Sequence, residues 1–117
     1  RLDYSMFMNG WGTLTGEASY TLGGLAHSNN PEVKLGAYNR IEYENSDVDR
    51  LLQTGARMMD ATARRATYEE AMEKVMEDKA YISIVQLQTV WGAKAGMLQF
   101  TPRFDEDTLA FFMKSAP

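Results

Sequence analysis

The chain has 117 residues, 44% of them hydrophobic and 24% charged, with a formal net charge of −4 at pH 7. This length and balance fit one globular domain and exclude a disordered chain. The acidic charge and the scattered Lys and Arg residues argue against nucleic acid and against an anionic membrane as partners. Cysteine is absent, which removes disulfides, thiolate metal sites and cysteine nucleophiles. No apolar run approaches the ~20 residues that a membrane span needs.

The first third of the chain predicts one strand and a long polar segment. The chain opens at Arg1 without an initiator methionine, and we expect this start to lie inside a longer protein. The apolar, β-prone run Tyr4–Met8, which Asn9-Gly10 stops, predicts a buried strand. Residues 10–30 are rich in Gly, Thr, Ser and Asn, and a segment of this length without clear periodicity is commonly functional or disordered. Within it, residues 20–25 indicate a short helical turn.

Two helices are predicted in the middle of the chain. Ser46 is the expected N-cap of the first, with Asp49 answering it three residues later. Its apolar positions at helical spacing are Val48, Leu51, Leu52, Gly55, Met58 and Met59. Asp60 is the expected N-cap of the second, which runs to about Glu77. Its expected buried stripe is Tyr68, Ala71, Met72, Val75 and Met76. Because the link at Asp60 is short, the helices should be antiparallel or steeply crossed neighbours.

The last third of the chain predicts extended structure. Tyr81–Leu87 alternates and is β-branched, which predicts a strand, and Val90–Ala93 is expected to be a second extended piece. Pro102 interrupts whatever precedes it. Residues 105–114 fit either a short helix or a final extended segment, and periodicity does not choose between them. The inward residues of the helix would be Leu109, Phe112 and Met113.

Catalytic and metal sites are not indicated. His27 is the only histidine. It stands in a polar loop with no Asp or Glu at a recognisable spacing, so we expect a solvated histidine rather than a general base. Glu44, Asp47 and Asp49 lie close in sequence but lack the spacing of an EF-hand, and helix capping explains Asp49. We therefore expect no enzyme, no bound metal and no cofactor.

The loop that begins at Trp11 is the candidate binding site. The indole follows an apolar strand pattern and precedes Gly12, Thr13 and Thr15. An aromatic ring supplies apolar area, glycine allows close approach of the backbone, and threonine hydroxyls supply hydrogen bonds. In α/β folds, ligands favour the region beyond the C-terminal ends of strands. The residue types fit a ligand wall and a core tryptophan with an ordinary loop equally well.

The order of several short blocks points to a family. The blocks are Gly10-Trp11, Tyr38-Asn39, Asn45–Asp49, Asp60 with Arg64-Arg65, Asp78 with Tyr81–Ile84, Val90-Trp91 and Thr101–Arg103. Together they resemble the C-terminal part of the extracytoplasmic solute-binding proteins of ABC importers, in the peptide, nickel and glutathione family (family 5). The resemblance covers nearly the whole chain. It implies an α/β fold class: a fragment of a two-lobed periplasmic-binding-protein (type II) fold, with short strands and an antiparallel helix pair.

The resemblance also implies a division of the chain and a function. Residues 1–88 would belong to the C-terminal ligand-binding lobe, and residues 89–117 would cross back to the first lobe. In the periplasm, the parent protein would capture a peptide-like or other small solute in the cleft between its two lobes and deliver it to an ABC transporter permease. The ligand-binding residues implied are Trp11, Gly12, Thr13, Thr15 and Glu17.

This chain departs from the pattern of the peptide-binding members at one position. Peptide binders that resemble this chain carry an aspartate three residues after the tryptophan, where this chain has Leu14. Thr15–Ala18 is more similar to the glutathione-type branch, so Glu17 is the candidate to supply the charge instead. A dipeptide, an oligopeptide, glutathione and a nickel complex all stay open as ligands.

Two other functions stay open. The chain could be an independent interaction module whose helix pair or edge strand binds a partner protein without a small ligand. It could also be a small enzyme that uses His27. In a fragment, apolar surface that has lost its cover is expected to favour self-association.

Overall fold

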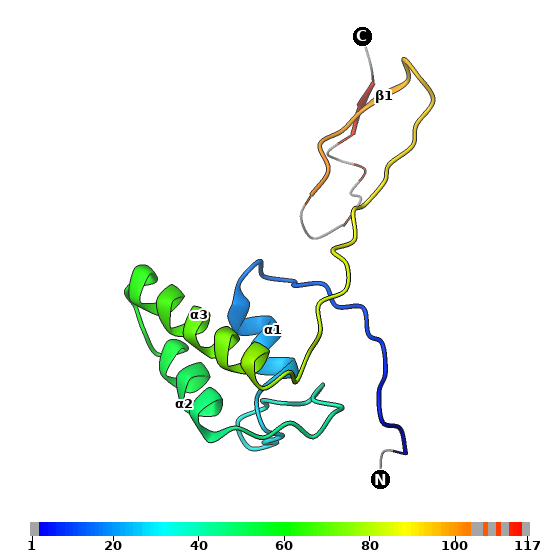
Figure 1. The fold of residues 1–117 in the computed structure, drawn as a ribbon. Helices are drawn as coiled ribbons and strands as arrows, with labels where there is room; N and C mark the ends of the chain where they lie inside the picture. The colour runs from blue at the N-terminus through cyan, green and yellow to red at the C-terminus, as the bar shows by residue number, and fades with distance from the viewer. Residues whose placement is uncertain (1–2, 104–106, 108–109, 111–112, 116–117) are drawn as a thin grey trace. The chain divides into compact units, whose positions relative to one another are not determined.

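The computed structural model describes residues 3–103, 107, 110 and 113–115. By its internal contacts the chain divides into two units, Arg1–Ile82 and Ser83–Pro117. The first unit contains helices α1 (Ala18–Leu25), α2 (Ser46–Gly55) and α3 (Ala61–Glu77), and the second contains strands β1 (Leu98–Gln99) and β2 (Lys114–Ser115) (Figure 1). In the part of the chain that the structure describes, no helix has the length and apolar character needed to span a membrane.

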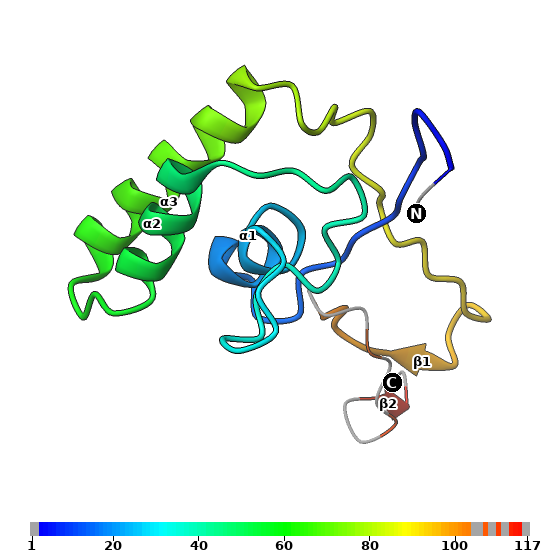
Figure 2. The same cartoon turned by 90° about the horizontal axis from the view of Figure 1, so that it is seen from below.

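Helices α2 and α3 run side by side in opposite directions, as the sequence predicts (Figure 2). Val48, Leu51 and Leu52 of α2 face the core together with Tyr68, Ala71 and Val75 of α3. The two helices approach closely at Gly55, where an added Cβ would lie 2.6 Å from the Tyr68 ring. Glycine at this position therefore sets the distance between the two helices.

The caps of the helix pair differ in part from the prediction. Asp60 caps α3 as predicted, and its Oδ1 accepts a hydrogen bond from the Ala63 N–H at 2.7 Å. The prediction of Ser46 as the N-cap of α2 is wrong by one residue. Asn45 holds that position, because its side-chain oxygen accepts from the N–H groups of Asp47 and Val48. Asp49 is consequently not part of a capping box.

The buried stripe is narrower than predicted. Met72 and Met76 of α3 are exposed, and Met59 after α2 is 93% exposed. Met72 and Met76 lie beside the stripe rather than on it, because α3 buries a single row of side chains against α1 and α2, and Met59 lies in the link between α2 and α3. The predicted inward position of these methionines is therefore wrong.

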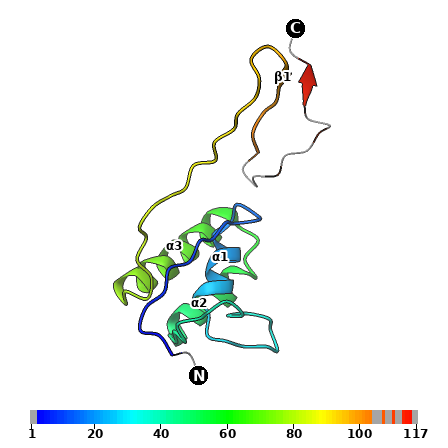
Figure 3. The same ribbon diagram turned by 90° about the vertical axis from the view of Figure 1, so that its right-hand side faces the viewer.

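Helix α1 packs against both members of the pair (Figure 3). Residues 20–25, predicted as a short turn, belong to this eight-residue helix. Leu22 and Ala26 enter the same core as α2 and α3, and Tyr81 packs against its edge. The Tyr81 hydroxyl donates a hydrogen bond to the Leu25 carbonyl at 2.6 Å, which ties the chain after α3 to the end of α1.

Two predicted strands are not strands in the structure. Tyr4–Met8 is irregular, and Met8 is 86% exposed rather than buried. Tyr81–Leu87 has no strand either, and Leu87 is 78% exposed. A strand needs a neighbour for its backbone hydrogen bonds, and no strand in the described part of the chain pairs with either segment. An apolar, β-prone pattern alone is therefore not sufficient to form a strand in this chain.

The second unit carries its strands further along the chain. β1 and β2 pair antiparallel, with Leu98 opposite Ser115 and Gln99 opposite Lys114. The Trp91 and Phe100 rings meet edge to face, with centroids 5.1 Å apart. For residues 105–114 the sequence leaves a short helix and a final extended segment open. Lys114, at the end of this range, lies in strand β2, whereas Leu109 and Phe112 lie outside the described residues. The internal contacts place the boundary between the two units after Ile82. The expected boundary at residues 88–89 separates two lobes of a larger fold, and it stays a prediction.

Candidate functional site

The candidate site begins with Trp11, whose side chain lies against α1. Its ring centroid is 5.7 Å from that of Tyr20 and 5.2 Å from that of Tyr38. Its Nε1–H donates a hydrogen bond to the Thr21 hydroxyl at 3.1 Å. The indole is only half-buried, so it forms an aromatic wall at the surface of the first unit rather than part of the core.

A groove of about 220 Å³ runs beside this wall. Gly23 and Gly24 of α1 bring the helix backbone to it, and an added Cβ on Gly24 would lie 3.5 Å from both Trp11 and Tyr38. The remaining side chains that line it are Ser19, Tyr20, Lys34, Leu35 and Ala37. The lining is mainly apolar and aromatic, which is the usual character of a small-molecule site.

Backbone hydrogen bonds hold the two sides of the groove together. The Gly36 N–H donates to the Gly23 carbonyl at 2.8 Å, and the Tyr38 N–H donates to the Gly24 carbonyl at 3.0 Å. Gly36 has φ +71°, and a Cβ there would lie 2.4 Å from the His27 carbonyl oxygen. Only glycine fits this position without strain. The groove is therefore built by a loop fixed on a helix.

The other predicted ligand residues lie away from the groove, at the start of α1. The Thr13 hydroxyl donates to the Glu17 carbonyl at 3.4 Å, and the Glu17 N–H donates to the Thr15 hydroxyl at 3.3 Å. The Glu17 carboxylate accepts from Arg64 Nε at 2.8 Å. Gly12 is exposed, with open space where a Cβ would be. Among the five predicted residues, only Trp11 lines the groove, and ligand contact by any of the five stays a prediction.

Apart from Trp11, the sequence predicted none of the residues that line the groove, and these include the side chains of Tyr20, Lys34 and Tyr38. Lys34 stands in a turn between Asn30 and Leu35, and no periodic pattern relates that turn to Trp11. The one available signal was the Gly23-Gly24 pair inside a helix, because glycine weakens a helix and its presence there suggests a close approach.

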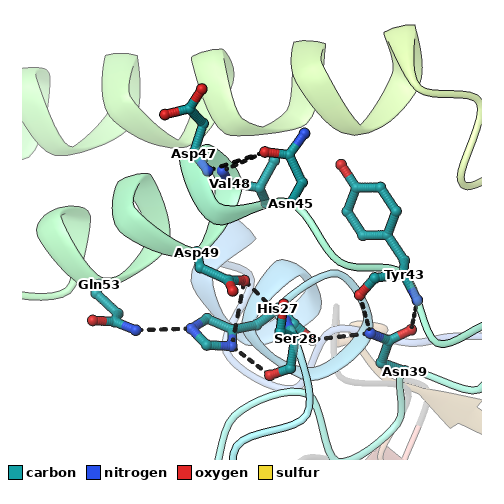
Figure 4. Close-up of polar contacts among 9 residues, drawn as sticks. All are labelled: His27, Ser28, Asn39, Tyr43, Asn45, Asp47, Val48, Asp49 and Gln53. Atoms are coloured by element: carbon teal, nitrogen blue, oxygen red, sulfur yellow. Dashed lines mark hydrogen bonds and ion pairs between the residues drawn. The ribbon is translucent and has the colours of Figure 1, made fainter.

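His27 is buried, at 2% exposure, so the expectation of a solvated loop histidine is wrong (Figure 4). Nδ1 lies 2.6 Å from the Ser28 carbonyl oxygen and 3.5 Å from Asp49 Oδ1, while Nε2 lies 3.0 Å from Gln53 Nε2. Because a carbonyl oxygen can only accept, the contact to Ser28 places a hydrogen on Nδ1, and Gln53 Nε2 lies within hydrogen-bond distance of Nε2. Both ring nitrogens are thus used within the fold.

The polar contacts around His27 join three segments of the first unit. Asp49 Oδ1 also accepts from the Ser28 N–H at 2.9 Å. The Asn39 amide donates to the carbonyls of His27 and Tyr43 and accepts from the Tyr43 N–H, as Figure 4 shows. With its nitrogens engaged in this way, the imidazole fixes the end of α1 against α2. This arrangement does not support a role as a general base.

A second polar cluster joins the start of α2 to the end of α3. Asp78 Oδ2 accepts from the Tyr43 hydroxyl at 2.6 Å and from the Asn45 amide at 2.7 Å. Burial and the bond to Asp78 raise the pKa of Tyr43 to about 12. The hydrogen bonds from Tyr43 and Asn45 lower the pKa of Asp78 below its ordinary value. The cluster is an anchor between helices.

Metal ligands do not gather within the described residues, where no group of three or more His, Cys, Asp or Glu side chains could hold an ion. Asp47 pairs with Arg50 at 3.0 Å, and Asp49 is engaged by Ser28 and His27. The carboxylates at 47 and 49 therefore have protein partners.

Comparison with known proteins gives one partial likeness. No protein-family model matches the chain, and no solved structure matches it significantly. Over 48 residues the chain is 42% identical to the probable D,D-dipeptide-binding periplasmic protein DdpA of Escherichia coli (strain K12). The match covers 41% of this chain and 9% of that protein. The likeness is thus to a small part of a periplasmic binding protein, not to an enzyme.

Proposed function

We propose that this chain is part of the solute-binding component of an ABC transporter, which captures a peptide-like solute in the periplasm and delivers it to a permease. The observation that carries the proposal is the 42% identity over 48 residues to a probable D,D-dipeptide-binding periplasmic protein. A D,D-dipeptide is accordingly the first ligand to test. The solute would enter a cleft between two lobes of a type II fold, and its capture would need no enzymatic step.

The exposed apolar segments support this proposal. Met6 and Met8 in the first unit, and Ile84, Leu87 and Val90 in the second, are largely exposed. Apolar, β-prone segments without strand partners are rare in a folded monomer, and they ordinarily mark a surface that other structure covers. In the proposed two-lobed fold, these segments would pair within the sheets. In the isolated chain they would favour self-association.

The polar residues before α1 would face the solute in this proposal. Gly12, Thr13 and Thr15 are exposed, and the backbone of an open, glycine-bearing loop can approach a ligand closely. Glu17 would supply a carboxylate for a ligand amine after exchanging its partner Arg64, since both side chains of that ion pair are partly exposed.

The test is calorimetric titration of the longer protein that contains these 117 residues with D-alanyl-D-alanine, L-alanyl-L-alanine and glutathione. We expect binding of one of them. Thr15→Ala should weaken that binding by about 1 kcal/mol if a ligand hydrogen bond is lost. Thr62→Ala, at an exposed position of α3, is the matched control and should bind as the unchanged protein does. No binding of any of the three ligands would contradict the peptide-like assignment.

A further inference from the structure

The groove beside Trp11 is formed entirely by residues 11–38. We propose that it is a binding site for a small carboxylate with an apolar or aromatic side chain, whose carboxylate meets Lys34 and whose side chain packs against the adjoining Trp11 and Tyr38 rings. A hydrophobic amino acid with a free carboxyl group, or the last residue of a short peptide, has this chemistry. The site goes beyond the proposed transport role, because it needs neither a second lobe nor the loop at residues 12–17.

The size of the groove sets the size of the ligand. Its volume is about 220 Å³, below the roughly 300–1,000 Å³ of sites that take drug-sized molecules. One aromatic or branched aliphatic side chain fills such a space. The rings of Trp11, Tyr20 and Tyr38 offer faces and edges on which an apolar group can pack.

The groove is formed before any ligand arrives. Its floor is the backbone of α1 at Gly23 and Gly24, and two backbone hydrogen bonds from Gly36 and Tyr38 attach the opposite side to that floor. The Trp11 ring is held in place by the hydrogen bond of its Nε1 to Thr21. A preformed site loses little conformational entropy on binding.

The charge at the rim of the groove determines whether the site favours an anionic or a cationic ligand. Three aromatic rings alone would also suit a cationic ligand. Lys34, however, carries the only charge among the described residues that line the groove. No carboxylate of the described chain pairs with it. The turn that carries Lys34 is fixed by reciprocal backbone hydrogen bonds between Asn30 and Leu35, at 2.9 and 3.1 Å. An ammonium group beside an apolar groove favours a carboxylate.

The experiment uses the intrinsic fluorescence of the 117-residue chain. Trp91→Phe leaves Trp11 as the only tryptophan, since the chain has two. This variant is titrated with N-acetyl-L-phenylalanine and with its neutral amide. The free acid should shift the Trp11 emission and bind about fivefold tighter than the amide, the preference that an exposed ion pair supplies. Lys34→Gln should abolish the preference, and Lys94→Gln, at an exposed lysine of the second unit, should retain it.

A second variant tests the location of the site. Gly24→Ala places a methyl group 3.5 Å from Trp11 and Tyr38, an ordinary contact that leaves the fold intact and fills the floor. Circular dichroism should show an unchanged or higher melting temperature, while the affinity for the acid falls severalfold. Equal binding of acid and amide, tighter binding of tetramethylammonium, or an unchanged affinity in Gly24→Ala would each overturn the proposal. The dipeptide titration of the longer protein could still succeed in those cases.

Discussion

The helices of the first unit bury a row of apolar side chains, whereas the apolar side chains of residues 84–90 in the second unit are exposed. Leu52 and Val75 are nearly inaccessible to solvent, while Leu87 is 78% exposed. Residues 84–90 are no less apolar than these helices, so the difference lies in the hydrogen bonding of the backbone. A helix satisfies its backbone within one segment, whereas a strand depends on a neighbour. Regular structure therefore forms at residues 46–55 and 61–77, where the hydrogen bonds are local, and not at residues 84–90.

The largest expected effect comes from replacing one leucine in each region by alanine. Leu52→Ala should lower the free energy of unfolding by about 2–5 kcal/mol, because it opens a cavity in the core. Leu87→Ala should change it by less than about 0.5 kcal/mol, since the side chain is exposed. Urea unfolding followed by circular dichroism measures both. Equal losses in the two variants would mean that residues 83–90 are packed in solution.

A pair of glycine substitutions tests the close approach of α2 and α3. Gly55→Ala should destabilise the chain by about 1–3 kcal/mol, because the new methyl group would meet the Tyr68 ring. Gly92→Ala is the control, as no atom lies within 4 Å of the corresponding Cβ position. Thermal unfolding of the two variants gives the comparison. A stabilised Gly55→Ala would show that the helices lie further apart.

A third pair of variants tests whether Asn45 or its neighbour Ser46 caps α2. Asn45→Ala should lower stability by about 1 kcal/mol, because its side chain accepts two backbone N–H groups and also donates to Asp78. Ser46→Ala should have an effect within about 0.5 kcal/mol. Chemical denaturation of both variants under the same conditions separates them, and the reverse order would restore Ser46 as the cap.

The smallest expected effect concerns pH and the Tyr43–Asp78 anchor. The pKa of Tyr43 is raised from 10.0 to about 12. The associated stability is thus fully present below pH 10 and is lost as the pH rises toward 12. The pKa of Asp78 is lowered, so its contribution is present above the ordinary pKa of an aspartate and is lost as the pH falls through the folded value.

Tyr43→Phe should weaken both of these pH dependences and cost about 1 kcal/mol at neutral pH. The alkaline loss should persist in part, because burial also raises the pKa values of Tyr68 and Tyr81. Denaturant midpoints measured from pH 3 to pH 12 give the profile. An identical profile in Tyr43→Phe would contradict the contribution of the hydrogen bond.

The predictable parts of the fold are those that short-range chemistry determines. The Asp60 cap and the spacing of Val48, Leu51 and Leu52 identified the helix pair, because each depends on residues within one or two turns. The burial of His27 depends on Asp49 and Gln53, more than twenty residues away, and no sequence spacing revealed it. Of the residues that line the groove, only Trp11 was predicted. The Trp11 side chain was recognised by type, but its partners Lys34 and Tyr38 reach it through a loop whose path is not periodic.

The segment Tyr81–Leu87 has a practical consequence for handling the protein. It contains no charged residue, no proline and no glycine, and its side chains from Ile82 onward are largely exposed. Six or seven residues of this kind are the sequence signature of steric-zipper fibrils. Concentrated, agitated samples should therefore become thioflavin-positive over time, and a single lysine in place of Val85 should delay that conversion by placing like charges along the growing stack.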